Sequence, residues 1–283
     1  MAAVLPSYLS KYSSFKLVYV VKQDLQFVIP QTIIVTQPPL SSLKVDKKNH
    51  WLHVASTKKV TLYEVHEKRG LDGIKSLGIY KNFKGVVIHD GWKAYSSLPT
   101  KHALCNTHHL RELQGIEENY NEAWTQKMSA LLRAAHEAVE KHRGKGELPR
   151  NHLRRFEQKY ANILKQGFEE HAALPSVASA GKKRGRKKQR KGKNLLDRLR
   201  NYQTETLRFL HDFQIPFTNN QAERDVRMMK AKQKISGCFR TKEGAILFGR
   251  IRGYLSTARK QGWNIVEALE QGIRGQPLLC TAN

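Results

Sequence analysis

The stretch from Asn219 to Ile235, NNQAERDVRMMKAKQKI, decides both the fold and the function that this sequence predicts. The two asparagines at its start are good helix N-caps, and the residues after them favour a helix. A mostly apolar stripe recurs at helical spacing and is made of Ala222, Val226, Met229 and Gln233. The neighbouring stripe opens with an acid and continues with basic side chains: Glu223, Arg227, Lys230 and Lys234. This pattern suits an acid that holds a metal ion beside a phosphodiester backbone.

A structural interpretation of Glu223 is equally open on this window alone. With Asn220 as the N-cap, Glu223 stands at the third helical position, where the glutamate of a capping box belongs. It could also pair with Arg227 one turn later.

The charge of the whole chain indicates which kind of partner the protein binds. Its 283 residues, enough for one large domain or two small ones, carry 50 Lys and Arg against 24 acids, a formal net charge of +26. The run KKRGRKKQRKGK, residues 182–193, supplies nine positive charges, and +17 remains without it. A charge block of this kind is usually disordered and binds nucleic acid non-specifically. We therefore expect nucleic acid as the partner, contacted by Arg224, Arg227, Lys230, Lys234, Lys182, Lys183, Arg184, Arg186, Lys187 and Lys188.

Other features of the sequence argue against a membrane protein and against a secreted protein. No apolar run approaches the length of a transmembrane helix, and the chain shows no signal peptide. The three cysteines are odd in number and widely spaced, which fits a reducing compartment. We expect a cytoplasmic protein.

The first half of the chain predicts a sheet. Residues 1–42 are rich in β-branched and aromatic residues, but Pro30, Pro38 and Pro39 argue against a central position in a sheet. From Leu43 onward, three short strands with tight polar turns are predicted within 43–65, followed by a short helix over 71–77. The run GVVIHDGW, 85–92, then predicts a strand that is buried on both faces.

Asp90 stands at the carboxyl end of that buried strand. In open α/β sheets ligands gather at the carboxyl ends of strands, which favours a functional role for Asp90. The alternative is that Asp90 caps a helix beginning near Trp92.

Four candidate metal-ligating residues follow within a short interval: His102, Cys105, His108 and His109. Cys105 and His108 have the spacing of a zinc-ligand pair, but a strand-to-helix junction scatters side chains in different directions. We therefore interpret the four as support for the site, by packing or by contact with DNA phosphate, rather than as a zinc centre.

The second half predicts helices. Residues 111–175 carry two amphipathic faces separated by a turn at 143–149, and a third amphipathic helix contains Leu196, Leu199, Thr206, Phe209, Leu210 and Phe213. Two more helices follow the Glu223 helix, the last with Asn264 as its N-cap and Glu267 as its N3 partner. The predicted division is an atypical segment 1–42, a first core part 43–110, a helical insertion 111–195 with the basic loop 176–193, a second core part 196–275 and a tail 276–283.

This order of elements, with acids on separate elements of an α/β fold, is how two-metal phosphoryl chemistry is built. Hard Mg²⁺ prefers oxygen ligands, so carboxylates are the required residues.

Four motifs carry a resemblance to a known family: HWLHVAST, HDGWKAY, HALCNTHHLREL and above all NNQAERDVRMMKAKQKISGCFRTKEGA. Over residues 43–273 the chain resembles the insertion sequence 66 family of bacterial transposases. The resemblance implies an RNase H-like mixed sheet flanked by helices, an all-helical insertion before the last catalytic helix, and an Asp-Asp-Glu triad. The second acid of the triad falls on Asp90 and the third on Glu223, with Mg²⁺ or Mn²⁺ as the cofactor. It also implies that a homo-oligomer associated with the nucleoid binds double-stranded DNA, both transposon ends and target.

The first acid of the triad is missing. In the family it stands twelve residues before the tryptophan that matches Trp51, which gives Pro39, in a segment reading PPLSSLKV where the family has DETGLKV or similar. Asp46 lies in an apparent hairpin turn, where aspartate is ordinary, and Asp24 is no better supported. The family's upstream portion, with its zinc-binding and helical regions, also has no counterpart in the sequence.

We therefore expect a transposase that is truncated or catalytically impaired. A DNA-binding remnant that occupies transposon ends without cutting is the alternative, and a generic RNase H-type nuclease is a third reading.

Overall fold

The computed structural model describes residues 32–36, 42–80, 83–174 and 189–280. The chain divides into two compact units: Met1–His102 together with Asn219–Asn283, and Ala103–Thr218. The second unit is thus inserted, in sequence, between two segments that build the first. Each unit is described by itself below.

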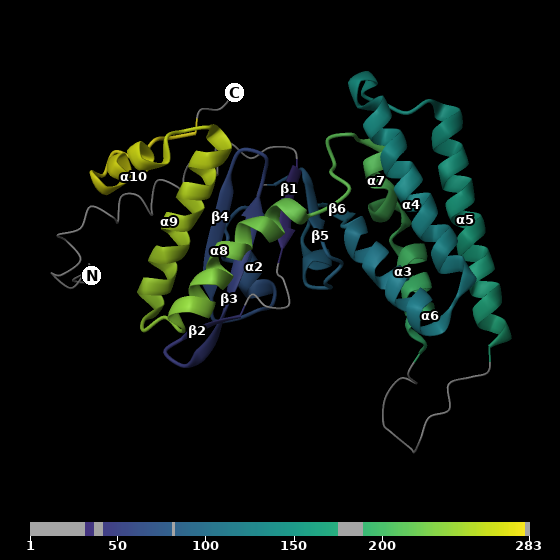
Figure 1. The fold of residues 1–283 in the computed structure, drawn as a ribbon, viewed down its shortest axis with the longest axis horizontal. Helices are drawn as coiled ribbons and strands as arrows, with labels where there is room; N and C mark the ends of the chain where they lie inside the picture. The colour runs from purple at the N-terminus through teal and green to yellow at the C-terminus, as the bar shows by residue number, and fades with distance from the viewer. Residues whose placement is uncertain (1–31, 37–41, 81–82, 175–188, 281–283) are drawn as a thin grey trace, which may run out of the picture. The chain divides into compact units, whose positions relative to one another are not determined.

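A mixed sheet forms the first unit (Figure 1). Its strands are β1 (Thr32–Thr36), β2 (Ser42–Val45), β3 (Lys48–Ser56), β4 (Thr61–His66), β5 (Val86–His89) and β6 (Lys101–Leu104). Their order is β2-β3-β1-β5-β6, with β4 also paired to β3. β1 runs parallel to β5 and antiparallel to β3, while β2 and β4 are antiparallel to β3. The strands predicted within 43–65 and at 85–92 are confirmed.

The β2–β3 hairpin closes with a two-residue turn at Asp46 and Lys47, both with positive φ (46° and 62°). Two positive φ values match the twist of a tight hairpin, although they disfavour residues with a side chain. Phe239 supports the turn, because the Asp46 N–H donates to its carbonyl at 2.9 Å and its own N–H donates to the Lys44 carbonyl at 2.8 Å. Asp46 therefore occupies the turn that the sequence predicted for it.

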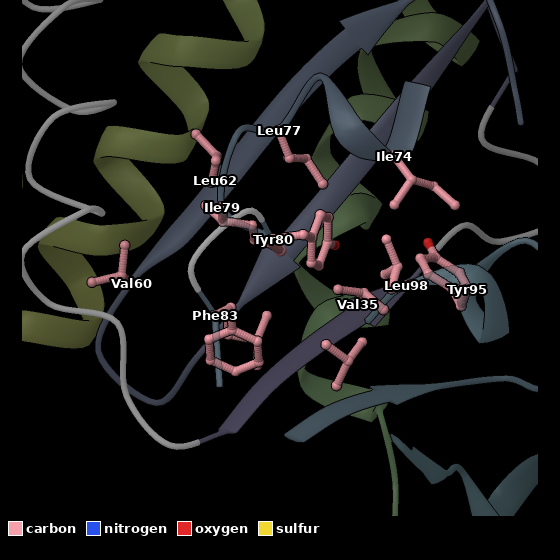
Figure 2. Packing of buried hydrophobic residues seen from close by; sticks show 13 residues of the cluster. Val35, Val60, Leu62, Ile74, Leu77, Ile79, Tyr80, Phe83, Tyr95 and Leu98 are labelled. Atoms are coloured by element: carbon pink, nitrogen blue, oxygen red, sulfur yellow. The ribbon is translucent and has the colours of Figure 1, made fainter. Parts of the chain in front are cut away.

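Helices cover both faces of the sheet. One face packs on α2 (Leu71–Lys75), η1 (Tyr95–Ser97) and the loops beside them, and Figure 2 shows the apolar cluster there. The other face packs on α8 (Asn220–Ser236) and α9 (Lys242–Gln261). On β3, Leu52 and Val54 point toward α8 and α9, whereas Ala55 points the other way, as the two-residue period of a strand requires. The fold is therefore α/β and RNase H-like, as predicted.

The position of β1 corrects the prediction for the N-terminal segment. The prolines were expected to keep this segment out of the centre of a sheet, yet β1 lies between β3 and β5. The five residues TIIVT contain no proline and supply every backbone donor that a central strand needs. Pro30, Pro38 and Pro39 fall outside both the strand and the described residues.

The end of the first unit follows the sequence prediction closely. α10 (Ile265–Ile273) begins after Asn264, whose side chain accepts from the N–H groups of Val266 at 2.9 Å and Glu267 at 3.2 Å. The predicted N-cap is confirmed.

The second unit is helical in its described residues from Asn106 onward, as the sequence predicted for an insertion. It contains α3 (Asn106–Tyr120), α4 (Ala123–His142), η2 (Arg143–Lys145), α5 (Arg150–Ala173), α6 (Lys191–Asn201) and α7 (Gln203–His211). The third predicted amphipathic helix is in fact two, α6 and α7, because the backbone leaves the helical region at Tyr202 (φ −120°, ψ 36°). Residues 196–218, which the sequence assigned to the core, lie in this unit.

Candidate active site

Asp90 directly follows β5, whose four residues are all buried. One carboxylate oxygen of Asp90, Oδ1, accepts from the Trp92 N–H at 3.0 Å, so the side chain closes a short turn and is held in one orientation. The next helical element is η1, which starts only at Tyr95. A helix beginning near Trp92, which the capping alternative required, is therefore not found.

Two histidines, the buried His89 and the half-buried His102, support the turn that carries Asp90. The Gly91 N–H donates to Nδ1 of His89 at 3.1 Å, so this nitrogen carries no proton and Nε2 must carry one. His89 Nε2 then donates to His102 Nδ1 at 3.2 Å, and His102 Nε2 donates to the Leu98 carbonyl at 3.2 Å. Burial, with His102 beside it, lowers the pKa of His89 to about 3. His102 thus contacts the turn that carries Asp90 through His89, and the backbone through Leu98.

The other three residues of the histidine and cysteine cluster lie in the helical unit. His109 is buried and its Nδ1 lies 3.3 Å from Oδ1 of Asn106, whose amide donates to the Thr206 carbonyl at 3.0 Å. Burial lowers the pKa of His109 to about 3. Cys105 is buried at the N-cap of α3, and His108 follows in its first turn. These contacts pack the helices of the second unit.

Glu223 lies in the first turns of α8, one position later than the capping box required. The N-cap of α8 is Asn219, which makes Glu223 the fourth helical residue, and its N–H donates to the Asn219 carbonyl at 3.3 Å. The apolar stripe is confirmed, since Ala222, Val226 and Met229 are buried. Glu223 itself is half-buried.

The basic residues of α8 lie largely toward solvent. Arg224, Arg227 and Lys234 are exposed and Lys230 is half-buried. The six predicted DNA contacts from Lys182 to Lys188 fall outside the described residues.

The two acids, far apart in sequence, belong to the same compact unit: Asp90 directly follows β5 and Glu223 lies within α8, and both elements adjoin β1. β1 pairs in parallel with β5, matching Ile34 with Ile88, so the carboxyl ends of both strands reach the same edge of the sheet. α8 packs across β1 and β3. Position 39, where the resemblance places the first acid of the triad, follows β1 in sequence and lies outside the described residues.

A buried ion pair that the sequence did not predict anchors α8. Asp225 and Lys260 have side chains only 8% and 9% exposed, and their Oδ2 and Nζ atoms lie 2.9 Å apart. Oδ2 also accepts from the Ser56 hydroxyl at 2.7 Å and the Thr61 hydroxyl at 3.2 Å, while the Tyr63 hydroxyl donates to the Asp225 carbonyl. Burial lowers the pKa of Lys260 and raises that of Tyr63. The pair ties α8 to α9 and to the turn between β3 and β4.

Comparison with known families shows which family the chain belongs to. A family model described as Transposase IS66 family matches residues 36–246. The chain belongs to the IS66 family of transposases. A search of curated proteins finds no match. No helix within the described part of this IS66 transposase is long and apolar enough to cross a membrane.

IS66 transposases belong to the DDE class, which uses divalent metal ions. Asp90 and Glu223 offer the hard oxygen donors that Mg²⁺ or Mn²⁺ prefers, so their chemistry fits the cofactor. Among the residues that the structure describes, no group of three or more His, Cys, Asp or Glu side chains could hold a metal ion together.

Proposed function

We propose that this IS66 transposase binds transposon ends through α8, that Asp90 and Glu223 hold its divalent metal, and that its cleavage is impaired. The observation that carries the proposal is the placement of both acids in one unit, on elements that adjoin the same central strand. A homo-oligomer acting on cytoplasmic, nucleoid-associated DNA completes the proposal.

The chain's own residues prepare the site in three ways. The Trp92 N–H holds Asp90, and His89, paired with His102, accepts from the Gly91 N–H in the same turn. The Asp225–Lys260 pair fixes the helix that carries Glu223. Exposed arginines of α8 neutralise the phosphates that bring the strand to the acids. When bound, the divalent ion would stabilise the attacking and leaving oxygens of phosphoryl transfer.

The impairment follows from the segment between β1 and β2. Residues 37–41 read QPPLS and contain no acid. Losing one of three carboxylates weakens metal binding and displaces the reacting phosphate, and small misplacements of this kind cost about a hundredfold in rate.

Cleavage and strand transfer on DNA that carries the element's terminal repeats, with Mg²⁺ or Mn²⁺, tests the proposal. We expect weak activity in the natural chain, loss of it in Asp90→Asn and Glu223→Gln, and a large gain when residues 39–42 are changed to the family's DETG (P39D, L40E, S41T, S42G). Activity that survives Asp90→Asn or Glu223→Gln would contradict the assignment.

The same missing acid favours a second candidate, a DNA-binding remnant that occupies transposon ends. It predicts binding to the terminal repeats with no cleavage, before and after the change to DETG. A generic nuclease would cut with no preference for those ends.

A further inference from the structure

Helix α10 carries large apolar side chains on its solvent side. Val266 is 75% exposed and Ile273 is 62% exposed. The two residues are seven positions apart, so they lie on one face of the helix, about 10 Å from each other along its axis. The buried Ala268 belongs instead to a cluster with Tyr254 and Ala258 of α9. A pair of exposed apolar side chains at this spacing is typical of a helix that inserts into a groove of a partner.

Acidic side chains accompany this apolar pair. Glu267 and Glu270 are both exposed on α10, and Arg274 forms an exposed ion pair with Glu270 at 2.5 Å. A carboxylate repels the phosphates of DNA, so this face is not suited to the nucleic acid that the rest of a chain of net charge +26 attracts. A fitting partner surface is apolar and carries positive charge at its sides.

The second unit offers a surface of that kind, a groove of about 500 Å³ between α4 and α5. Its apolar part consists of the buried Leu131 and Ile163 and the half-buried Phe156. Ala130 and Ala134 are exposed in its lining, and their short side chains leave room for the side chains of a partner. Along α4 the lining extends from position 127 to position 134, the same seven-residue interval that separates the apolar pair of α10.

The lining of the groove is positively charged. Among its described residues two are lysines, Lys127 on α4 and Lys159 on α5, and none is acidic. Nζ of Lys127 donates to Oε1 of Gln166 at 2.9 Å, a neutral amide that does not cancel the charge of the ammonium. Each side of the groove thus carries a charge opposite in sign to Glu267 and Glu270.

We propose that α10 of one copy of this chain docks in the α4–α5 groove of a second copy. Val266 and Ile273 fill the groove beside the exposed alanines of α4, and the two glutamates of α10 face the lysines at its sides. The two surfaces differ, so the contact is head-to-tail, and an open assembly keeps one free groove and one free α10 at its ends. This inference rests on the proposed function, of which the homo-oligomer is a part, and names the surfaces that join its copies.

Light scattering after size-exclusion chromatography measures the mass of the full chain, without DNA or metal, over a series of protein concentrations. About 0.3 M salt shortens the Debye length to below about 8 Å, so the repulsion between two copies of net charge +26 is screened. The α10 variant carries Val266→Asp and Ile273→Asp, and the groove variant carries Ala130→Glu and Ala134→Glu.

Two matched controls make the same exchanges elsewhere. Ile235→Asp replaces an apolar residue that is 83% exposed on α8, and Ala161→Glu replaces an exposed alanine of α5 outside the groove lining. Thermal unfolding checks that each variant and each control is folded.

We expect the natural chain and both controls to self-associate, and each variant to lose about tenfold or more in affinity for itself. An equimolar mixture of the two variants should form a dimer and nothing larger, because the intact groove of one accepts the intact α10 of the other. If both variants self-associate like the natural chain, or if the mixture stays monomeric, the inference is wrong and the homo-oligomer of the proposed function stands. A natural chain that is monomeric throughout overturns both of these, whereas the metal site and the DNA binding keep their own tests.

Discussion

The turn that carries Asp90 is stabilised by His89, and protonation of that ring would break a hydrogen bond of the turn. The hydrogen bond from the Gly91 N–H requires an unprotonated Nδ1 on His89, and burial lowers the pKa of that ring to about 3. His53, whose Nε2 donates to the Lys68 carbonyl at 3.2 Å, has its pKa lowered by burial to about 4. Both folded-state pKa values lie below the ordinary 6.5, so the folded unit binds fewer protons than the unfolded chain between pH 6.5 and those values.

The stability that these histidines contribute is therefore complete above pH 6.5 and falls as the pH drops toward 4. At pH 5, each of the two histidines should lower the free energy of unfolding of the first unit by about 2 kcal/mol relative to its value at neutral pH. Urea unfolding at pH 7 and pH 5 measures the loss. His89→Gln, which does not titrate, should be less stable at pH 7 but lose less on acidification, and an equal loss in both proteins would refute the assignment.

At the scale of elements, α8 is placed by polar contacts as much as by its apolar stripe. The Asp225–Lys260 pair is buried, and removing one partner of such a pair leaves an uncompensated charge. Asp225→Asn and Lys260→Met should each lower the free energy of unfolding by about 3–5 kcal/mol. The double variant should lose less than the sum of the two single losses.

A double-mutant cycle by urea unfolding measures this coupling. The exposed pair Arg274–Glu270 supplies the control, and Arg274→Met should change stability by less than about 0.5 kcal/mol. Additive effects at Asp225 and Lys260 would show that the two side chains do not act as a pair.

The packing of α2 against β3 makes a second element-scale prediction. A Cβ at Gly73 would lie 2.2 Å from the Lys68 carbonyl oxygen, which is backbone and cannot rotate away, whereas a Cβ at Gly70 meets nothing within 4 Å. Gly73→Ala should destabilise the protein by about 1–3 kcal/mol and loosen the loop between β4 and α2. Gly70→Ala, compared in the same thermal unfolding experiment, should be close to neutral, and equal effects would contradict this packing.

Elements with a local signature could be predicted from the sequence, and elements that depend on distant partners could not. The buried strand before Asp90, the hairpin turn at Asp46 and the cap at Asn264 each follow from a few neighbouring residues. The sequence does not predict the central place of β1, because the nearby prolines argue against it although they lie beside the strand and not within it. The Asp225–Lys260 pair joins side chains from separate elements, which the periodicity of a sequence does not record.

At the scale of the whole molecule, the chain carries more positive charge than the basic residues of α8 supply. The run over residues 182–193 carries nine of the charges that make up the net +26. Replacing its basic residues with Ser and Gly should weaken binding to all duplexes alike and flatten the salt dependence, because such contacts carry no sequence information. The preference for the terminal repeat over unrelated DNA should remain. Anisotropy titrations over a range of salt check both results, and an unchanged salt dependence would show that the run makes no phosphate contact.

The central claim is that Asp90 and Glu223 hold one divalent site between them. Mn²⁺ binding in the presence of duplex DNA, followed by electron paramagnetic resonance, tests this directly and without any need for turnover. Asp90→Asn and Glu223→Gln should each weaken Mn²⁺ binding to a similar extent, and the double variant should bind little more weakly than either alone. If one of the two changes leaves Mn²⁺ binding unaffected, or if the two losses of Mn²⁺ affinity simply add in the double variant, the acids do not share an ion.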